Sequence, residues 1–451
     1  MANPARYDLR QMSSLQKELH KPKEDAEYWN NCFADIFEPV ARNASSTVSF
    51  KSVKSNKGTV DYTIDDNLDY LDYSYLVQEI PPVKVAPEYQ DTIEIKWPDF
   101  PGINLFKYAV LKSDDIAVNT LSPIGIYNYM KFIMEPRMFD KYLKLIGHRS
   151  NLTTWSKELP SDELYVMLPW FYAIHPSKAL PIFLLKDREK IIHRFEFNSI
   201  EKLLRMRQRI PDSNEWKEIP FNLNYITMNM TNDKYLPTPE MFARMSLVDE
   251  EDKEEIRCQA KDQGGIYQRF IDDFVVIPST EEFQEGQAGT IQLNHDAPCK
   301  AISFLAVNTQ AHKLNNYCNF TDNLEDVSEG AWPILNYSLN YGSVSRIPET
   351  PIKRVEMEAL YCMQNNINHD GMAMHCFDLR PNFLEACSGP VFKQLNAVFK
   401  VQFKEPSSNS PPQRYTLVVV LWVTKKLLLK MDEKDPQYYN VFIEPDISMK
   451  I

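Results

Sequence analysis

The sequence predicts an all-β fold of two tandem eight-stranded jelly-roll β-sandwiches, with short helices in the loops. Strand-like runs recur in two sets of roughly eight, one on each side of a polar segment at residues 210–222. The chain has 451 residues, which is more than one hydrophobic core usually supports. Its 30 prolines and 12 glycines indicate long, stiff connections. We therefore expect an N-terminal arm at 1–44, a first jelly roll at 45–215 and a second at 216–451.

The first half begins with about 40 polar, helix-compatible residues, which predict an arm outside the sandwiches. Two segments, 126–134 and 139–146, have helical spacing and lie between strands. The predicted strands of this half are 47–53, 60–64, 73–80, 92–97, 106–111 and 191–197.

One segment of this half, ELYVMLPWFYAIHPSKALPIFLL at 163–185, is highly apolar. A membrane helix is excluded because Pro169, Pro176 and Pro181 would break it. The segment instead predicts a buried strand at 164–168, a loop, and a second apolar element at 180–185.

The second half follows a polar segment at 210–222, which carries two prolines and is the predicted linker. A charged helix is expected at 248–263, because acidic residues at its start complement the helix dipole. Residues 309–350 are expected to be a long, proline-rich connection. The predicted strands are 224–230, 274–277, 290–293, 301–308, 352–360, 373–379, 397–403 and 415–424.

Charge and cysteine content exclude several classes of protein. The net charge of -12 argues against binding to a phosphate backbone and is sufficient to keep a concentrated protein soluble. The seven cysteines form no CxxC pair, which indicates reduced thiols in a cytosol-like compartment. The N-terminal residues contain no apolar signal core, so we expect no secretory signal.

No catalytic, cofactor-binding or metal-binding residue can be assigned from motifs. Phosphate-binding glycine loops and a G-x-S-x-G nucleophile elbow do not occur in the sequence. The one metal-like cluster has a spacing that matches no familiar zinc pattern, and buried core cysteines explain it better. Its members are His369, His375, Cys376 and Cys387.

Two further sets of residues have a functional and a structural interpretation. Acidic pairs suit general acid/base chemistry, but neighbours on a strand point to opposite faces and do not converge. Tryptophans suit sugar stacking, but packing inside the sandwiches is the better interpretation. The pairs are Asp65-Asp66, Asp114-Asp115 and Asp272-Asp273, and the tryptophans are Trp97, Trp155, Trp170 and Trp332.

An ordered series of segments from about residue 73 to 424 resembles the major capsid proteins of nucleocytoplasmic large DNA viruses. In the first half, ELYVMLPWFYAIHPSKALPIFLL followed by EKIIHRFEF is similar to the end of that family's first jelly roll. NLFKYAVLKSDDIAVNTLSPIGIYNYMKFIM resembles its strand, turn and short helix. In the second half, LVDEEDKEEIRCQAKDQGGIYQRFIDDF resembles its acidic helix, and QLNHDAPCKAISFLAVN its strand entry. PIKRVEMEALY and MHCFDLRPNFLEACSGPVFKQLNAVFKVQF resemble its closing strands.

The resemblance implies a structural protein and not an enzyme. It implies a homotrimeric, pseudo-hexameric capsomer that tiles the icosahedral shell of a large DNA virus, in the virion, after assembly in the host cytoplasm. The expected partners are other copies of the chain, neighbouring capsomers, and minor capsid and penton proteins. An inner viral membrane would lie nearby, and no cofactor or direct nucleic-acid contact is implied.

Two alternatives remain open at this point. The first is a transient double jelly-roll scaffold that shapes a viral membrane, because it would have the same sequence pattern. The second is a carbohydrate-binding or hydrolysing β-sandwich, which would need converging carboxylates or an exposed aromatic row.

Overall fold

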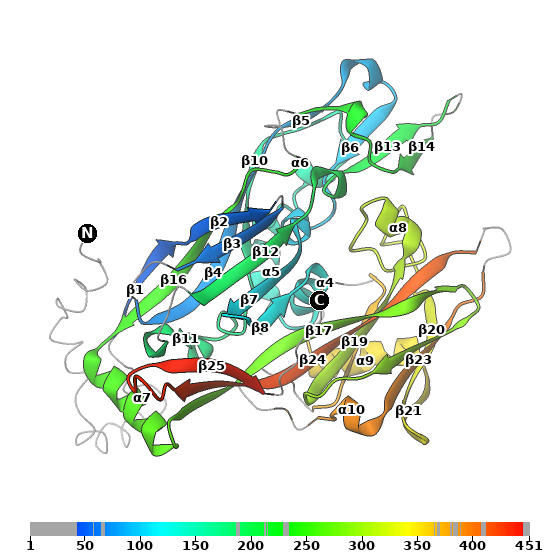
Figure 1. Ribbon diagram of the computed structural model, residues 1–451. Coiled ribbons are helices and arrows are strands. Elements are labelled where there is room, and N and C mark those ends of the chain that lie inside the picture. The colour runs from blue at the N-terminus through cyan, green and yellow to red at the C-terminus, as the bar shows by residue number, and fades with distance from the viewer. Residues whose placement is uncertain are drawn as a thin grey trace, which may run out of the picture.

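The structure is a computed structural model in which two β-sandwiches stand side by side (Figure 1). This confirms the predicted all-β double jelly roll. The predicted arm at 1–44 lies almost wholly outside the described residues, because the first of them is Asn43. The structure describes residues 43–56, 58–64, 68–185, 190–211, 213, 215–228, 234–364, 366–367, 370–378, 381, 387, 389–406 and 412–444.

The first sandwich consists of two five-stranded sheets. Neighbouring strands within each sheet are antiparallel. In strand β12 every second side chain is buried, which is the alternation that a half-buried strand requires. One sheet contains β1 (Asn43–Ser49), β16 (Glu240–Val248), β4 (Tyr70–Ile80), β10 (Asp162–Met167) and β11 (Leu180–Pro181). The other contains β2 (Lys51–Asn56), β3 (Thr59–Thr63), β12 (Ile191–Phe197), β7 (Phe106–Ser113) and β8 (Ile116–Leu121).

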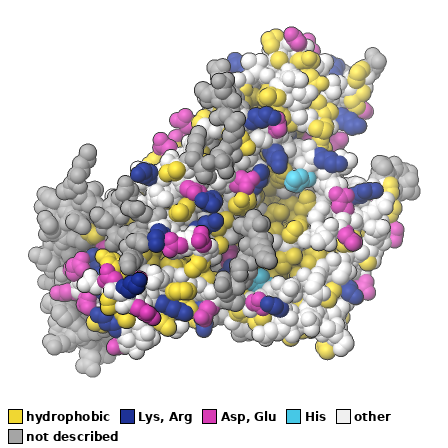
Figure 2. Space-filling model, in the orientation of Figure 1, with side chains coloured by type: hydrophobic (Ala, Val, Ile, Leu, Met, Phe, Trp, Pro, Cys, Tyr) yellow, Lys and Arg dark blue, Asp and Glu magenta, His cyan; other side chains and the backbone are white. Residues whose placement is uncertain are grey.

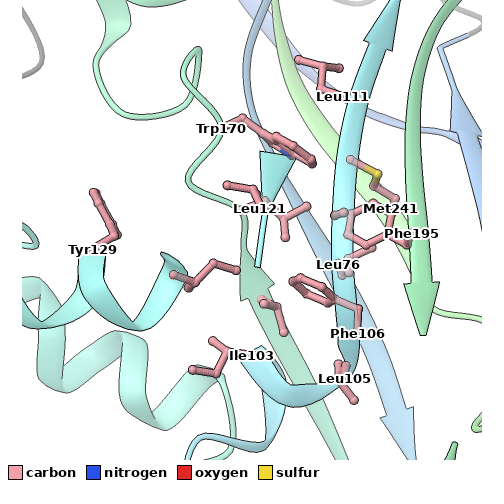
Figure 3. Packing of buried hydrophobic residues seen from close by; sticks show 14 of the residues in the cluster. Leu76, Ile103, Leu105, Phe106, Leu111, Leu121, Tyr129, Trp170, Phe195 and Met241 are labelled. Carbon is pink, nitrogen blue, oxygen red and sulfur yellow. The ribbon is translucent and has the colours of Figure 1, made fainter. Parts of the chain in front are cut away.

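Aliphatic and aromatic side chains together fill the space between these two sheets (Figure 3). Phe195 meets Phe106 edge to face, with ring centroids 5.4 Å apart, and Trp170 meets Phe195 at 6.3 Å. Trp170 comes from the apolar segment at 163–185, which therefore supplies core side chains as predicted. The second apolar element, predicted at 180–185, consists of the two-residue strand β11 and a short 3-10 helix, and its side chains are buried.

Two small three-stranded sheets project from the first sandwich at the top of Figure 1. They include β14, which lies inside the predicted linker at 210–222 and pairs with β13. The linker prediction is therefore wrong for this strand. The polar sequence of the segment fits a half-buried edge strand of the projection equally well. The sheets contain β14 (Trp216–Ile219), β13 (Arg205–Arg209) and β6 (Ile93–Lys96), and β15 (Ile226–Met228), β5 (Val83–Val85) and β9 (Glu158–Leu159).

Strand β16 lies after the predicted domain boundary at 215 and 216. It nevertheless pairs with β1 and β4 in the first sandwich, between residues Glu240 and Val248. Because the whole of β16 pairs with these strands, the pairing is better evidence for its domain than the polar composition of the predicted linker. We therefore propose that the first sandwich extends to Val248 and that the second begins after it.

The second sandwich consists of a five-stranded and a four-stranded sheet, so β25 adds one strand to the eight expected of a jelly roll. The ends of β17 and β24 extend toward the first sandwich, where β25 pairs with β24 (Figure 1). One sheet contains β17 (Ile266–Gln284), β24 (Arg414–Met431), β19 (Cys299–Asn308) and β22 (Met372–Cys376), with β25 (Tyr439–Glu444). The other contains β18 (Ala288–Leu293), β23 (Ala397–Phe403), β20 (Ile334–Tyr341) and β21 (Val344–Pro351).

Two predictions for this half are wrong. Residues 352–360 form a helix and not a strand, because the buried Ile352 and Val355 lie three residues apart, on one face of a helix. The connection at 309–350 contains helix α8 and the hairpin of β20 and β21. Bulges interrupt the pairing of that hairpin, which weakens the regular alternation by which a strand is recognised in sequence.

The helices lie in the loops, as predicted, and α4, α5 and α7 occur where helical spacing was found. Asp249 caps α7 by accepting a hydrogen bond from the Glu250 backbone N–H. None of the helices in the described ranges has the length and apolarity needed to cross a membrane. The α-helices are α4 (Pro123–Phe132), α5 (Pro136–Leu145), α6 (Ser150–Thr153), α7 (Glu250–Asp262), α8 (Thr309–Lys313), α9 (Ile352–Cys362) and α10 (Phe392–Leu395). The 3-10 helices are η2 (Pro87–Tyr89), η3 (Pro101–Asn104), η4 (Pro176–Lys178), η5 (Ile182–Leu184), η7 (Ile200–Lys202) and η8 (Leu223–Tyr225).

Candidate functional site

The metal-like cluster considered from sequence is not assembled among the residues that the structure describes. His369 lies outside those residues. His375 Nδ1 lies 2.7 Å from Glu358 Oε2, and burial raises the pKa of Cys376 above its ordinary value. Cys387 Sγ accepts a hydrogen bond from a nearby backbone N–H instead. The described part of the chain contains no group of three metal-binding side chains.

The acidic pairs do not converge on a common point. Asp272 contacts Lys300 at 2.9 Å, whereas Asp273 accepts a hydrogen bond from Asn119 at 2.8 Å. Neighbouring strand positions face opposite ways, so each carboxylate has its own partners. Asp114 lies in a surface turn, 3.3 Å from Lys190 Nζ. The pair Asp65-Asp66 lies outside the described residues.

The four tryptophans form no common sugar-stacking surface. Trp97 and Trp170 are fully buried, in agreement with the packing interpretation. The Trp155 ring makes two cation–π contacts: Lys96 Nζ lies 4.8 Å and the Arg207 guanidinium 4.9 Å from its ring centroid. Trp332 donates a hydrogen bond to Glu356 at 2.9 Å.

The residues that do converge lie at the junction of the two sandwiches. Lys131, on α4 of the first sandwich, forms a buried ion pair with Asp370 and donates a hydrogen bond to the Met372 carbonyl at 2.8 Å. Tyr127 donates to the other oxygen of Asp370 at 2.9 Å. Burial lowers the pKa of Lys131, and the nearby Asp370 carboxylate opposes that shift. The pair therefore links α4 directly to the entry of β22.

A second buried contact joins the sandwiches through strand β8. Asn119 of β8 donates to Asp273 of β17, and Lys425 of β24 forms an ion pair with the same carboxylate. Nearby, Ser303 of β19 donates to the Asn128 side chain on α4. Buried polar groups of this kind hold one geometry, because separating them leaves each group without its partner. The two sandwiches therefore form a single rigid pair.

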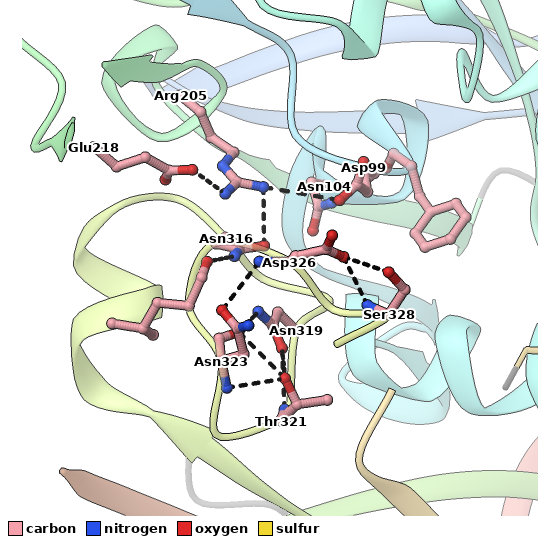
Figure 4. Close-up of polar contacts among 12 residues, drawn as sticks. Asp99, Asn104, Arg205, Glu218, Asn316, Asn319, Thr321, Asn323, Asp326 and Ser328 are labelled. Carbon is pink, nitrogen blue, oxygen red and sulfur yellow. Dashed lines mark hydrogen bonds and ion pairs between the residues drawn. The ribbon is translucent and has the colours of Figure 1, made fainter. Parts of the chain in front are cut away.

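A third contact joins the projection of the first sandwich to a loop of the second (Figure 4). The buried Arg205 guanidinium lies 2.6 Å from Glu218 and 3.1 Å from the Asn316 side-chain oxygen. On the same loop, Asn315 donates to the backbone carbonyls of Glu201 and Leu204, each at 2.7 Å. Figure 4 shows the side chains of this loop turned toward one another below Arg205. These hydrogen bonds hold the loop at Asn315 and Asn316 against the first sandwich.

Sequence reasoning did not find these junction residues, since no motif marks them. One signal was available for Lys131, which is the only charged residue in the apolar helical segment IYNYMKFIM. A lone charge on a buried helix requires a partner. Asp370, however, lies 239 residues away in the sequence, and only the fold brings the two together.

Comparisons with known proteins show a fold similar to that of viral major capsid proteins. No family model matches the chain, and no curated protein matches it by sequence. Among solved structures, it is similar to the major capsid protein of Faustovirus, with a TM-score of 0.67 and 9% identity. That match covers 94% of this chain and 99% of the other.

Two further structures support the same fold. VP54 of PBCV-1, as fitted into a reconstruction of the virophage Sputnik, matches with a TM-score of 0.65 and 13% identity, over 91% of this chain and 99% of that one. The major capsid protein of mavirus matches with a TM-score of 0.51 and 10% identity, over 88% and 90%. At these identities the comparisons show the fold, and both sandwiches are included in it.

Proposed function

We propose that this chain is the major capsid protein of a large DNA virus. Three copies would form a pseudo-hexameric capsomer, and capsomers would tile an icosahedral shell. The observation that carries the proposal is the shared double jelly roll, which extends over nine-tenths of this chain and nearly all of VP54 and the Faustovirus protein.

The junction between the sandwiches supports this role physically. A shell unit made of three copies presents six sandwiches, and they approximate a hexagon only if each pair keeps one orientation. The buried ion pair of Lys131 with Asp370 and the buried hydrogen bond from Asn119 to Asp273 cross between the sandwiches and favour one orientation. A structural role as a shell subunit, rather than catalysis, is what we propose for the chain.

Exposed apolar side chains support association between copies. Met357 and Tyr361 are 68% and 74% exposed and lie four residues apart on α9, so they share one face of that helix. Val344, on the edge strand β21 that leads toward α9, is 64% exposed. Paired apolar side chains of this size on one helix face are typical of interaction surfaces.

Self-association is the first test. The purified chain should behave in light scattering as a particle of about three times its 52.6 kDa mass, with little monomer at micromolar concentration. A clean monomer or a symmetric dimer would contradict the trimer and remove the main support for a capsomer.

Location and partners belong to the same proposal. We expect the chain in purified virions, assembled in the host cytoplasm, in contact with minor capsid and penton proteins and close to an inner membrane. Mass spectrometry of purified particles separates this role from that of a transient scaffold. A scaffold would be abundant in infected cells and missing from mature particles.

A further inference from the structure

A groove of about 630 Å³ opens between the two sandwiches, beside helix α8. The first sandwich contributes the starts of β7 and α4, and the second contributes β17, β19, β24 and α8. Figure 2 shows this place as a hollow with hydrophobic atoms on its floor, in the position that α8 borders in Figure 1. The groove adjoins the junction, since Tyr127, which donates to Asp370, is also one of its lining residues.

The floor and walls of the groove are apolar. Phe106 and Val418 are buried at its base, and Ile124, Val276 and Val307 are half-buried in its walls. Half-buried apolar side chains that face an open volume gain free energy when an apolar group covers them. The floor therefore suits a hydrocarbon chain or an apolar ring system.

The rim beside α8 is basic. Lys202, His312 and Lys313 are exposed there, and the His312 ring meets Tyr317 with centroids 5.2 Å apart. The Tyr317 hydroxyl donates to the Lys202 backbone carbonyl at 3.0 Å, which holds the backbone of Lys202 next to α8. Lys107, also at the rim, already has a carboxylate partner in Glu196.

The balance of charge at the groove favours an anion. Glu282 is the one carboxylate among the lining residues, against Lys202 and Lys313, because Lys107 is paired with Glu196. A negative group held near Lys202 and Lys313 would be attracted by both.

We propose that this groove binds a small amphipathic anion, namely a single apolar chain or ring system that carries a carboxylate. Its apolar part would cover the half-buried Ile124, Val276 and Val307, and its carboxylate would lie between Lys202 and Lys313. The volume lies within the range of small-molecule sites, whereas a stable protein partner needs roughly 800 Å² on each side. The site does not depend on the capsid role.

The test is calorimetric titration of the full chain, in the association state in which it purifies, with dodecanoate below its micellar concentration. We expect one molecule bound per chain. Dodecyltrimethylammonium has the same tail and the opposite charge, and butyrate has the same head and a short tail. Each should bind at least tenfold more weakly. Equal binding of dodecanoate and the ammonium compound, or no binding of dodecanoate, would overturn the proposal.

Variants locate the binding. Val307→Trp should fill the groove and weaken dodecanoate binding at least tenfold, whereas Val53→Trp on the exposed edge strand β2 should not change it. Lys202→Gln combined with Lys313→Gln should remove the preference for the anion, and Lys217→Gln on β14 is the matched control. Unfolding temperatures confirm that each variant folds. If Val307→Trp disrupts self-association and leaves dodecanoate binding unchanged, the groove is a contact between copies and the proposal is wrong.

Discussion

His193 is a fully buried basic side chain in the core of the first sandwich. Its Nε2 lies 2.8 Å from the Tyr172 hydroxyl, which lies 2.8 Å from Ser74 Oγ. The rings of Phe50 and Trp170 pack against it edge to face. Burial lowers the pKa of His193 from 6.5 to about 3, so the imidazole stays neutral in the folded protein.

This shift predicts acid sensitivity. Below pH 6.5 the unfolded chain binds a proton at His193 and the folded chain does not, so stability falls by up to about 1.4 kcal/mol per pH unit down to about pH 3. Above pH 6.5 both states are neutral and the contribution to the pH slope disappears. Urea midpoints between pH 7.5 and 4 should therefore fall less steeply for His193→Gln than for the parent. The exposed His175→Gln is the matched control, and an unchanged slope in His193→Gln would contradict this account.

Gly371 is a backbone position that only glycine fits. Its φ is +81°, and an added Cβ would lie 2.0 Å from the Phe320 carbonyl oxygen. Gly371→Ala should destabilise the protein by on the order of 3 kcal/mol or prevent folding. Gly342→Ala is the control, since φ there is +56° with nothing within 4 Å, and its cost should be about 1 kcal/mol. Similar thermal unfolding temperatures for the two variants would contradict this prediction, because they would mean that the backbone moves to make room for a Cβ at Gly371.

At the scale of elements, the contact between α4 and the entry of β22 rests on the Lys131–Asp370 pair. Asp370→Ala leaves a buried ammonium without its partner and should cost about 3–5 kcal/mol in chemical denaturation. Adding Lys131→Met to that variant should restore part of the loss. The exposed pair of Lys84 and Glu158 is the control, and Glu158→Ala should cost less than about 1 kcal/mol. Equal losses at the two pairs would refute the structural role of the junction.

Helix α9 provides the element-scale test of self-association. Replacing its exposed Met357 and Tyr361 with serine should raise the dissociation constant of the proposed trimer at least tenfold, because the proposed interface would lose apolar contacts. Analytical ultracentrifugation measures this change. Val53→Ser on the edge strand β2, which is 51% exposed, is the control for loss of a surface apolar group. If both variants associate like the parent, α9 is not at the interface.

The same helix shows what sequence could and could not predict. Strands with clean alternation, such as β12 and β23, were predicted with their observed bounds because one face is buried and the pattern is local. Residues 352–360 contain β-branched Ile352 and Val355, which resemble a strand, but their spacing and the charged residues between them favour a helix. The sheet that β16 joins and the junction pairs depend on contacts between distant segments, which no local pattern encodes.

At the scale of the whole molecule, the ordered resemblance predicted the double jelly roll, and the fold comparisons confirm it across both sandwiches. The buried junction then explains why the two sandwiches act as one body. What the monomer does not determine is the number of copies in a particle, because that number depends on surfaces that meet only between chains.

Electron microscopy of the purified chain tests the central claim most directly, because it reports both the number of copies and their arrangement. Class averages should show particles with threefold symmetry and a hexagonal outline, made of six similar densities, with three projections formed by the small sheets around β6 and β13. Particles with two lobes only, or with twofold symmetry, would contradict the account of this chain as a capsomer subunit.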